Sequence, residues 1–453
     1  MSPAPARKTD VIVIGAGPAG EEISLDLRDR GHEVVAVERE LVGGECAYWA
    51  CMPSKALLRP RALRGEAERY RGVAGARIDV GETLSKRDEA NESLDDSGKA
   101  EALSEAGVEL VRGEARLIGE RRVEVAGETI EASEAVVVAT GTKAMVPDAF
   151  RAAEPWTNRE ITVAEEPPES LIVVGGGYIG CEMACAWRSL GTEVTMIAGP
   201  GGVLEREADF AAELVKAQLE ADGVEVESGE AAGAERKGEE VVVAFGDGRE
   251  LRAAQLLVAI GREPRSEGLG LEDGWLDDAG FVETDEQLRV GGNGWLYAVG
   301  DVNGRALLTH EATLQARFAA RIIAGESVSI PDHPGGPPHV IFTTPQIASV
   351  GHTPDAASEE GLAFREIDAD PGMTAAATFT GGSERTGGQF VVTDEEDPRI
   401  LGATFCGPEV ADLLYAANLA VVAGLRLSQI CETAPAFPTR SEVWLQAMPE
   451  ASD

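Results

Sequence analysis

The sequence is poor in aromatic residues, in lysine and in long apolar runs. Aromatic residues make up 5% of the 453 residues, and lysine supplies 7 of the 40 basic residues, the other 33 being arginine. No run approaches the roughly 20 apolar residues of a membrane-spanning helix. The opening stretch MSPAPARKTD lacks the apolar core of a signal peptide. We therefore expect a cytoplasmic protein that does not enter a membrane.

Positive charge is also scarce, since 40 basic residues stand against 79 acidic ones and the formal net charge is −39. Such a surface repels nucleic acid and anionic membranes, so neither is expected as a partner. Two explanations for the missing lysine stay open: a surface adapted to concentrated salt, or a GC-rich genome that favours Arg, Ala, Gly and Glu. The length suggests about three domains, and a hydrophobic content of 43% allows each to bury a core.

The strongest pattern that is present is an internal repeat of strand, glycine-rich turn and helix. In the first copy the apolar run 10–14 precedes the glycines, and a second strand ends at Glu38. In the second copy the apolar run 171–174 precedes them, and the second strand ends at Ala198. The glycines are Gly15, Gly17 and Gly20 in the first copy, and Gly175, Gly177 and Gly180 in the second. Two copies in the same register predict two βαβ dinucleotide-binding folds.

Each glycine of such a turn has its own task. The first permits the tight turn, the second lets the backbone approach a pyrophosphate, and the third lets helix and strand pack closely. The helix N-terminus offers N–H donors to the phosphates. Glu38 stands where a carboxylate can accept hydrogen bonds from ribose hydroxyls. A glycine turn without a ligand is the alternative, and the spacing to Glu38 argues against it.

Further strands and a linker complete the predicted architecture. Buried parallel strands are expected before Gly141 and Gly261, and a third ends at Gly300 and Asp301. The stretch 329–339, with four prolines and two glycines, predicts a domain boundary. After it the pattern favours antiparallel strands and one helix. The predicted fold class is therefore α/β, with two Rossmann-like domains followed by an α+β domain.

Of six cysteines, only Cys46 and Cys51 stand in a context that suggests chemistry. On a regular helix their Cα atoms would be roughly 8–9 Å apart, whereas a disulfide needs roughly 4.4–6.8 Å. A helix carrying both must therefore be distorted if they pair. Pro53 supplies a cause, because it removes the hydrogen bond to the carbonyl of Trp49. Two unlinked buried cysteines are the alternative.

The remaining cysteines are expected to be structural. Cys181 and Cys185 are four apart on a helix and are interpreted as small packing residues rather than metal ligands. Cys431 is close enough in sequence to Phe437 to approach the same pocket, but a buried structural cysteine is favoured. No metal ligands are predicted.

In combination, these motifs resemble the class I pyridine nucleotide–disulfide oxidoreductases. The motifs are the two glycine fingerprints, C-x4-C-x-P-S-K, ATGT, AIGR and AVGD. That family includes glutathione reductase, dihydrolipoyl dehydrogenase, mycothione reductase and mercuric reductase. The resemblance implies a homodimer whose interface domain completes the partner's active site. It also implies four segments: an FAD-binding domain (1–150), an NAD(P)-binding domain (151–268), a central segment completing the FAD domain (269–330) and a dimerisation domain (331–453).

The resemblance also implies roles for individual residues. Cys46 would be the thiol that meets the substrate, and Cys51 the thiol against the flavin. Lys55 would lie near flavin N5 and pair with Glu182. The implied FAD site comprises Gly15, Gly17, Gly20, Glu38, Gly44, Thr140, Gly141, Gly300 and Asp301, the last binding the ribityl chain. The implied NAD(P) site comprises Gly175, Gly177, Tyr178, Gly180, Gly261 and Arg262. Tyr178 would gate the nicotinamide pocket, unless it is an ordinary packed tyrosine.

The choice between NADPH and NADH rests on the end of the second strand of the repeat. A carboxylate there favours NADH and a basic group favours NADPH, but the residue is Ala198. Gly180 favours NADH, whereas Arg206 could reach a 2′-phosphate. We expect NADPH or NADH, with a preference for NADPH because the missing carboxylate removes a repulsion.

The sequence departs from the family at its acid–base group. The family's C-terminal His is replaced by Phe437 in APAFPTRSE, and Glu442 keeps the position of the accompanying acid. Phenylalanine cannot transfer a proton. Either the substrate has a good leaving thiol, or Glu442 or a water replaces the His, or the acceptor is a metal ion, a quinone or oxygen. His310 is interpreted as structural.

The leading functional hypothesis is an enzyme that reduces a low-molecular-weight disulfide with NAD(P)H and FAD. Tyr48, Trp49 and Phe437 could form an aromatic pocket for a flat or cationic disulfide such as that of ergothioneine, although Tyr48 and Trp49 could equally pack under the flavin. The alternatives are a dihydrolipoyl dehydrogenase-type component of a multienzyme complex, or a metal or quinone reductase of the mercuric reductase type.

Overall fold

The computed structural model describes residues 7–380 and 385–448. The first six residues, part of the stretch examined for a signal peptide, and the last five lie outside the described residues. The chain divides into two compact units. The first unit comprises Met1–Pro53, Asp88–Met145 and Gly261–Pro331, and the second comprises Ser54–Arg87, Val146–Ile260 and Asp332–Asp453. No helix in the described part of the chain is long and apolar enough to cross a membrane.

A seven-stranded sheet forms the centre of the first unit. Its parallel part has the order β3–β2–β1–β6, with β16 also beside β6, and β5 and β4 continue it with antiparallel pairing. The strands are β1 (Arg7–Ile14), β2 (Val34–Glu38), β3 (Glu109–Arg112), β4 (Ala115–Gly119), β5 (Arg122–Val125), β6 (Glu128–Val138) and β16 (Leu296–Ala298). A separate two-stranded ribbon joins β7 (Thr142–Ala144) to β15 (Arg262–Pro264).

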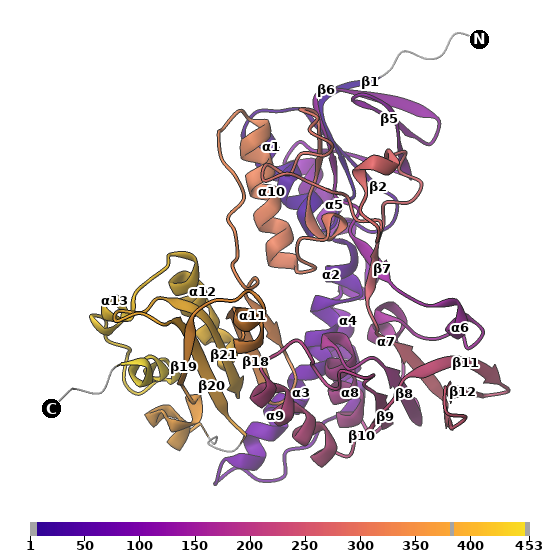
Figure 1. Cartoon of the computed structure of the whole chain (residues 1–453). Coiled ribbons are helices and arrows are strands. Elements are labelled where there is room, and N and C mark those ends of the chain that lie inside the picture. Colours follow the sequence, from indigo (N-terminus) through magenta and orange to yellow (C-terminus); the bar gives the residue numbers. More distant parts are fainter. Residues whose placement is uncertain (1–6, 381–384, 449–453) are drawn as a thin grey trace. The chain divides into compact units, whose positions relative to one another are not determined.

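Helices α1 (Pro18–Asp29) and α10 (Thr309–Ile323) lie side by side in this unit (Figure 1). Small residues make the close approach possible, because Ala19 of α1 and Ala312 and Ala316 of α10 share one buried cluster with the strands. A second buried cluster contains the side chains of the opposite strand faces, such as Ile12 and Val136. Both faces of the parallel strands are thus buried, as their continuous apolar runs predict. The unit also contains α2 (Gly44–Tyr48), η1 (Glu92–Leu94), α5 (Ser97–Glu105), η2 (Asp273–Trp275) and η3 (Gly300–Asn303).

The second unit contains the second copy of the repeat. Its parallel sheet has the order β10–β9–β8–β14, and an antiparallel sheet β11–β12–β13 packs against it through a buried cluster. The strands are β8 (Ser170–Val174), β9 (Glu193–Ile197), β10 (Glu225–Glu227), β11 (Ala231–Lys237), β12 (Glu240–Phe245), β13 (Glu250–Ala253) and β14 (Gln255–Val258). The helices are α6 (Asp148–Arg151), α7 (Asn158–Val163), α8 (Tyr178–Ser189) and α9 (Asp209–Ala221). Two more helices run from one unit into the other: α3 (Cys51–Arg69) and α4 (Val80–Ala90).

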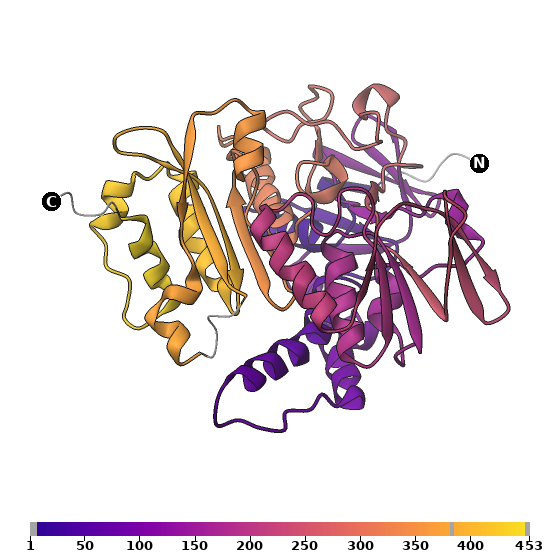
Figure 2. The same ribbon diagram turned by 60° about the horizontal axis from the view of Figure 1, so that its bottom comes forward.

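The rest of the second unit is the predicted α+β segment. Its five-stranded antiparallel sheet has the order β17–β18–β21–β20–β19, drawn in orange to yellow in Figure 2. The strands are β17 (His339–Ile341), β18 (Gln346–Gly351), β19 (Phe364–Asp368), β20 (Gly387–Thr393) and β21 (Ile400–Gly407). The helices are α11 (Pro354–Glu359), η4 (Pro371–Met373), η5 (Ala375–Thr378), η6 (Val410–Leu413), α12 (Leu414–Val422), α13 (Leu427–Cys431) and η7 (Arg440–Ala447). The expected proline-rich linker has no helix or strand before β17.

Candidate active site

The two glycine turns have the same backbone geometry. Gly15 has φ +99°, and a Cβ added to it would lie 2.4 Å from the carbonyl oxygen of Ala139. Gly175 has φ +122°, and its Cβ would lie 2.3 Å from the carbonyl oxygen of Ala259. In both units only glycine can turn the chain from strand to helix while the neighbouring strand ends so close by. The repeat predicted from spacing is therefore a repeat in structure.

We call the backbone surface formed by a glycine turn and the start of its helix a cradle. The other glycines keep the first cradle, at Gly15–Gly20, clear of side chains. A Cβ on Gly44 would lie 2.9 Å from the Cα of Gly17, and a Cβ on Gly20 would lie 1.9 Å from the carbonyl oxygen of Gly15. Helix α1 begins directly after Gly17, so its unpaired N–H groups face this cradle. A backbone surface of this kind fits a pyrophosphate.

Glu38 ends β2 beside this cradle, and backbone donors fix its carboxylate. Its Oε2 accepts from the N–H of Ala16 at 2.7 Å, and its Oε1 accepts from the N–H of Glu40 at 2.7 Å. A carboxylate has about four acceptor positions, so two are left for the hydroxyls of a ribose. The geometry fits the adenosine half of FAD.

The carboxyl ends of β6 and β16 bring the other predicted FAD residues into the same unit. Asp301 follows β16, and its Oδ2 accepts from the hydroxyl of Thr142 at 2.9 Å. Burial raises the pKa of Asp301, although Arg262 and Thr142 oppose this shift. The Gly300 N–H donates to Gln315 at 2.8 Å, and the Thr140 hydroxyl donates to the carbonyl oxygen of Arg265 at 2.7 Å. The carboxylate of Asp301 is thus fixed in position and is available as an acceptor for a ligand hydroxyl.

Arg262 makes its contacts in the first unit, although the sequence assigned it to the NAD(P) site. Its Nε donates to the Thr142 hydroxyl at 2.7 Å, and its Nη2 lies 3.7 Å from Glu45. Glu45 also binds Arg265 at 3.0 Å. The neighbouring Gly261 lies at the boundary between the units and has the side chain of Met145 nearby.

The two candidate redox cysteines lie on two helices rather than on one distorted helix. Helix α2 ends at Tyr48, Trp49 leaves the helical conformation with φ −134°, and α3 starts at Cys51. Pro53 then lies in the first turn of α3, where a missing N–H is harmless. The break provides the close approach that a regular helix forbids.

One hydroxyl lies beside both sulfurs. The Oγ1 of Thr309, at the start of α10, is 3.3 Å from the Sγ of Cys51 and 3.3 Å from the Sγ of Cys46. The two sulfurs therefore cannot be farther apart than twice this distance. The sequence analysis missed Thr309, which lies more than 250 residues from the cysteines.

An ion pair in the second unit joins α3 to α8. The Nζ of Lys55 lies 2.8 Å from the Oε2 of Glu182, whose side chain is buried. The Oε1 of Glu182 accepts from the N–H of Phe342 at 2.9 Å. Lys55 also lies 5.0 Å from the centre of the Phe342 ring. Both carboxylate oxygens are thus occupied, so this pair has a single geometry.

Tyr178 is the first residue of α8, immediately after Gly177. Its hydroxyl donates to the Oε1 of Glu207 at 2.6 Å, and the Nε2 of His339 lies 2.9 Å from the same oxygen. Neither Glu207 nor His339 was singled out from the sequence. No short-range pattern could have revealed them, since they lie in the loop after β9 and at the start of β17.

The predicted aromatic pocket is only partly compatible with the structure. Tyr48 is fully buried, and its hydroxyl donates to the carbonyl oxygen of Val42 at 2.9 Å. Tyr48 is therefore a core residue of the first unit and cannot line an open pocket. Trp49 is half-buried and packs edge-on against Tyr48, whereas Phe437 is 77% exposed. The nearby Glu442 accepts from the N–H of Ala375 at 3.1 Å.

Three of the remaining four cysteines are buried, namely Cys181, Cys185 and Cys406, and their structural role stays a prediction. Cys181 and Cys185 lie in the core around α8, where burial raises the pKa of the Cys181 thiol and raises that of Cys185 to about 11. A thiol of this kind is a poor metal ligand. Cys431 is half-buried at the end of α13.

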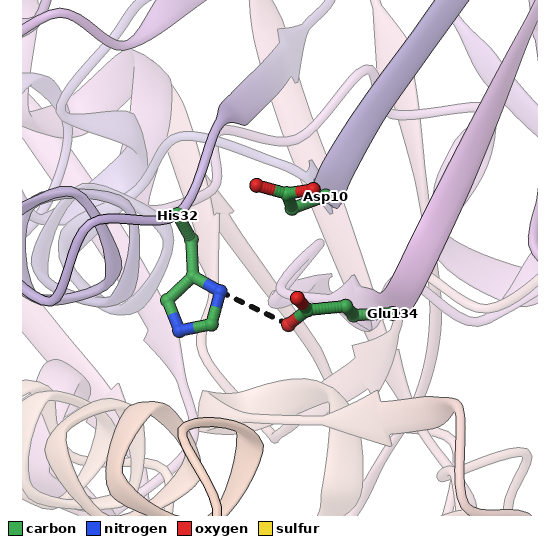
Figure 3. A group of neighbouring side chains, drawn as sticks. All are labelled: Asp10, His32 and Glu134. Carbon is green, nitrogen blue, oxygen red and sulfur yellow. Dashed lines mark ion pairs between the residues drawn. The ribbon is translucent and has the colours of Figure 1, made fainter.

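One group of possible metal ligands occurs among the described residues, namely Asp10, His32 and Glu134 (Figure 3). The Nδ1 of His32 lies 2.9 Å from Glu134, and Asp10 lies beside them. Both oxygens of Asp10 already accept protein hydrogen bonds, from the N–H of Glu33 at 2.8 Å and the hydroxyl of Ser133 at 2.9 Å. These contacts explain the group as polar interactions that join β1 and β6 to the turn between α1 and β2.

Comparisons with known proteins place the chain in a family. The family model described as "Pyridine nucleotide-disulphide oxidoreductase" matches residues 9–316, and its dimerisation domain matches residues 337–448. Two relatives are named dihydrolipoyl dehydrogenase. The one from Thermus scotoductus is 34% identical over 97% of this chain and 96% of its own, and the one from Haloferax volcanii is 32% identical over 98% and 97%.

Solved structures agree with this placement. LpdA from Mycobacterium tuberculosis is 26% identical and has a TM-score of 0.87 over 97% of this chain and 100% of its own. RclA from Escherichia coli, a flavoprotein disulfide reductase, is 22% identical with a TM-score of 0.84 over 96% and 98%, which shows a shared fold. With two dinucleotide cradles and this fold, the chain belongs to the pyridine nucleotide–disulphide oxidoreductase family, as an NAD(P)H-dependent flavoprotein oxidoreductase that uses FAD together with NAD(H) or NADP(H).

Proposed function

We propose that this enzyme reduces a low-molecular-weight disulfide with electrons from NADPH or NADH, through Cys46 and Cys51. The observation that supports this most is the meeting of both sulfurs at the Thr309 hydroxyl. Bound FAD would accept hydride from the nicotinamide and pass two electrons to the Cys46–Cys51 disulfide. The resulting dithiol is the reagent that meets the substrate.

The thiol half of the reaction is two exchanges. The Cys46 thiolate attacks one sulfur of the substrate, forming a mixed disulfide and releasing the first thiol as its anion. The Cys51 thiolate then attacks the Cys46 sulfur, which re-forms the protein disulfide and releases the second thiol. Two electrons thus leave the protein pair, and the substrate is released as two thiolates, which take up two protons from water.

The missing acid restricts the substrate. Phe437 cannot protonate a leaving thiolate, and the Glu442 carboxylate is held by the Ala375 N–H. A substrate whose released thiol is stable as an anion or as a thione needs no such acid. This favours thione-forming disulfides of the ergothioneine type among small disulfides. We further propose a cytoplasmic homodimer, in which Phe437 faces the partner's thiols.

Dihydrolipoyl dehydrogenase activity is the second candidate, because the relatives have that name. Oxidation of dihydrolipoamide requires a base for the incoming dithiol, and phenylalanine provides none. Failure to reduce NAD⁺ with dihydrolipoamide would eliminate this candidate. A metal or quinone reductase is the third, and turnover that survives the Cys46→Ser substitution would support quinone or oxygen chemistry.

The decisive experiment is anaerobic stopped-flow absorbance with NADPH, then NADH, followed by a panel of disulfides. We expect a long-wavelength thiolate-to-flavin band on reduction, which one class of disulfide discharges. Cys51→Ser should abolish the band. Cys46→Ser should keep it but prevent its discharge, and Cys431→Ser is the matched control that changes neither. Flavin that is reduced without the band, and reoxidised only by quinone or oxygen, would contradict the proposal.

A further inference from the structure

The side chain that begins α8 is held by two groups that no dinucleotide fingerprint requires. Tyr178 is the first residue of α8 and follows the glycine turn directly, so its backbone lies at the start of the helix that borders the second dinucleotide cradle. Its hydroxyl donates to Glu207 at 2.6 Å. Its ring stacks on that of His339 with 5.4 Å between ring centres and 17° between planes. The ring is thus fixed from its edge and from one face.

Glu207 is a buried carboxylate whose two oxygens have different surroundings. Its side chain is 1% exposed, and its Oε1 receives both the Tyr178 hydroxyl and the Nε2 of His339. Its Oε2 is buried and accepts no hydrogen bond within residues 7–380 and 385–448. A buried charge with one unsatisfied oxygen depends strongly on its remaining partners. Glu207 therefore needs both of these contacts.

His339 can supply the compensating positive charge. Burial alone would lower its pKa, but the hydrogen bond and charge of Glu207 outweigh burial, so that the pKa of His339 is raised. Its Nδ1 lies 3.2 Å from the carbonyl oxygen of Pro337. Both ring nitrogens thus face acceptors, which suits the doubly protonated ring. The charges that act on Tyr178 come from Glu207 and Arg206.

The same segment also reaches the Lys55–Glu182 pair. Tyr178 and Glu182 are four residues apart on α8 and so lie on one face of the helix. His339 meets this face at Tyr178, and Phe342 meets it at Glu182 through the 2.9 Å hydrogen bond. His339 and Phe342 therefore contact the two ends of one turn of α8. That turn connects the nicotinamide cradle with the lysine on the cysteine-bearing helix α3.

We propose that Glu207 and His339 are positioning residues that fix the Tyr178 ring for the nicotinamide cofactor before it binds. The inference rests on the proposed function only for the identity of the final electron acceptor. A side chain that is ordered in advance removes an entropic penalty from binding. The Tyr178–Glu207–His339 group therefore affects cofactor affinity, while the later thiol exchange is independent of it.

The test separates cofactor binding from hydride transfer by anaerobic stopped-flow. The dependence of the flavin reduction rate on cofactor concentration gives the Kd and the limiting rate. In Tyr178→Phe and Glu207→Leu we expect the Kd to rise about fivefold, as one immobilised side chain implies, with a limiting rate within about twofold of wild type. The double variant should bind no more weakly than Glu207→Leu, because the Tyr178–Glu207 hydrogen bond is already lost in that single variant.

The pH profile provides a readout that general destabilisation does not change. Charged His339 neutralises Glu207, so cofactor affinity should be highest at low pH and decline as the pH rises through the raised pKa of His339, above the ordinary value near 6.5. Glu207→Gln keeps an acceptor for Tyr178, so it should restore much of the affinity while removing this pH dependence. His339→Phe keeps the stack and should flatten the profile as well.

Glu213→Gln, on the exposed start of α9, is the matched control and should match wild type in both affinity and pH profile. Unchanged Kd values in Tyr178→Phe and Glu207→Leu, or additive effects in the double variant, would overturn the proposal. Failure of the proposed disulfide activity would appear only when the reduced enzyme is mixed with disulfides. The two failures are therefore distinguishable.

Discussion

Glu21, in the first turn of α1, has an unusual electrostatic environment. Burial raises its pKa to about 7, with Lys99 opposing and Glu92 and Glu38 adding to the shift. Because the folded pKa lies above the unfolded value, the neutral form is favoured in the folded protein. The contribution of the neutral Glu21 carboxyl to the free energy of unfolding is fully present below about pH 4.5 and is lost as the pH rises through about 7.

Glu21→Gln should therefore stabilise the FAD-loaded protein at alkaline pH. We expect a gain on the order of 2 kcal/mol at pH 8 and a clearly smaller gain at pH 5.5. Chemical denaturation at the two pH values measures it. Glu105→Gln, at an exposed position at the end of α5, should show no such difference. Equal gains at both pH values would contradict the assigned cause.

Thr309 provides a second prediction for a single residue. A hydroxyl that donates to a thiolate stabilises the anion, and such charge-assisted bonds contribute more than neutral ones. Thr309→Val removes the donor at constant volume and should lower disulfide turnover about tenfold. Reduction of the flavin by NAD(P)H should continue unchanged. Thr309→Ser restores the hydroxyl and should recover most of the activity, which steady-state assays would show.

Among the elements, the strand–turn–helix units could be predicted because their signal is local. Continuous apolar runs, three glycines and one helix lie within about 25 residues in each copy, and the strands and helices appear where expected. A distortion between Cys46 and Cys51 could be predicted from the spacing that a disulfide needs, but its form, a break into two helices at Trp49, could not, because Trp49 leaves the helix without a proline or glycine at that position. The burial of Tyr48 involves a hydrogen bond to the carbonyl of Val42, six residues earlier, and packing that periodicity does not encode.

Long-range contacts explain what the sequence could not reveal about the candidate site. Thr309 reaches the cysteines from another segment, and His339, the last residue of the proline-rich stretch, stacks on Tyr178. Hydroxyls and histidines have no periodic signature, so only the folded chain brings them together. Glycine and cysteine spacings, in contrast, are set by local backbone geometry and could be recognised directly.

The repeated glycine turns give a matched pair of element-scale tests. A Cβ at Gly175 would clash with the carbonyl of Ala259, and one at Gly15 with the carbonyl of Ala139. Gly175→Ala should keep bound FAD but slow flavin reduction by NAD(P)H at least tenfold, because the second cradle must shift. Gly15→Ala should instead lose FAD. Flavin absorbance and stopped-flow reduction distinguish the two, and the same defect in both variants would refute separate cradles.

For the whole molecule, the charge of −39 predicts a strong dependence on ionic strength. Repulsion between exposed charges is largely screened once the Debye length falls below about 5 Å, near 0.5 M salt. If repulsion alone is responsible, the Tm should rise steeply with KCl up to this concentration and then level off. A Tm that keeps rising above 1 M KCl would instead support a salt-adapted surface. Thermal unfolding in a KCl series measures it.

The α12 surface argues for association of two chains through the segment that matches the dimerisation domain. Tyr415, Leu419 and Val422 recur every three or four residues on one helical face, and they are 72%, 50% and 49% exposed. Apolar side chains grouped in this way are typical of a protein interface. Phe437, in the same segment, is 77% exposed. If a partner chain covers this face of α12, these exposed apolar side chains become buried in the interface between the two chains.

Acidic substitutions on that face should therefore separate the two chains. They should abolish disulfide turnover while leaving hydride transfer from NAD(P)H intact. We expect Tyr415→Asp combined with Leu419→Glu to give monomers in sedimentation velocity, whereas Ile118→Glu, an exposed apolar residue of β4, should remain dimeric. Each chain contains both dinucleotide cradles, so the monomer should still accept hydride from NAD(P)H. Disulfide turnover should be lost, since the partner's Phe437 segment would no longer cover the Cys46 thiol. Monomers that retain full disulfide turnover would mean that each chain completes its own active site.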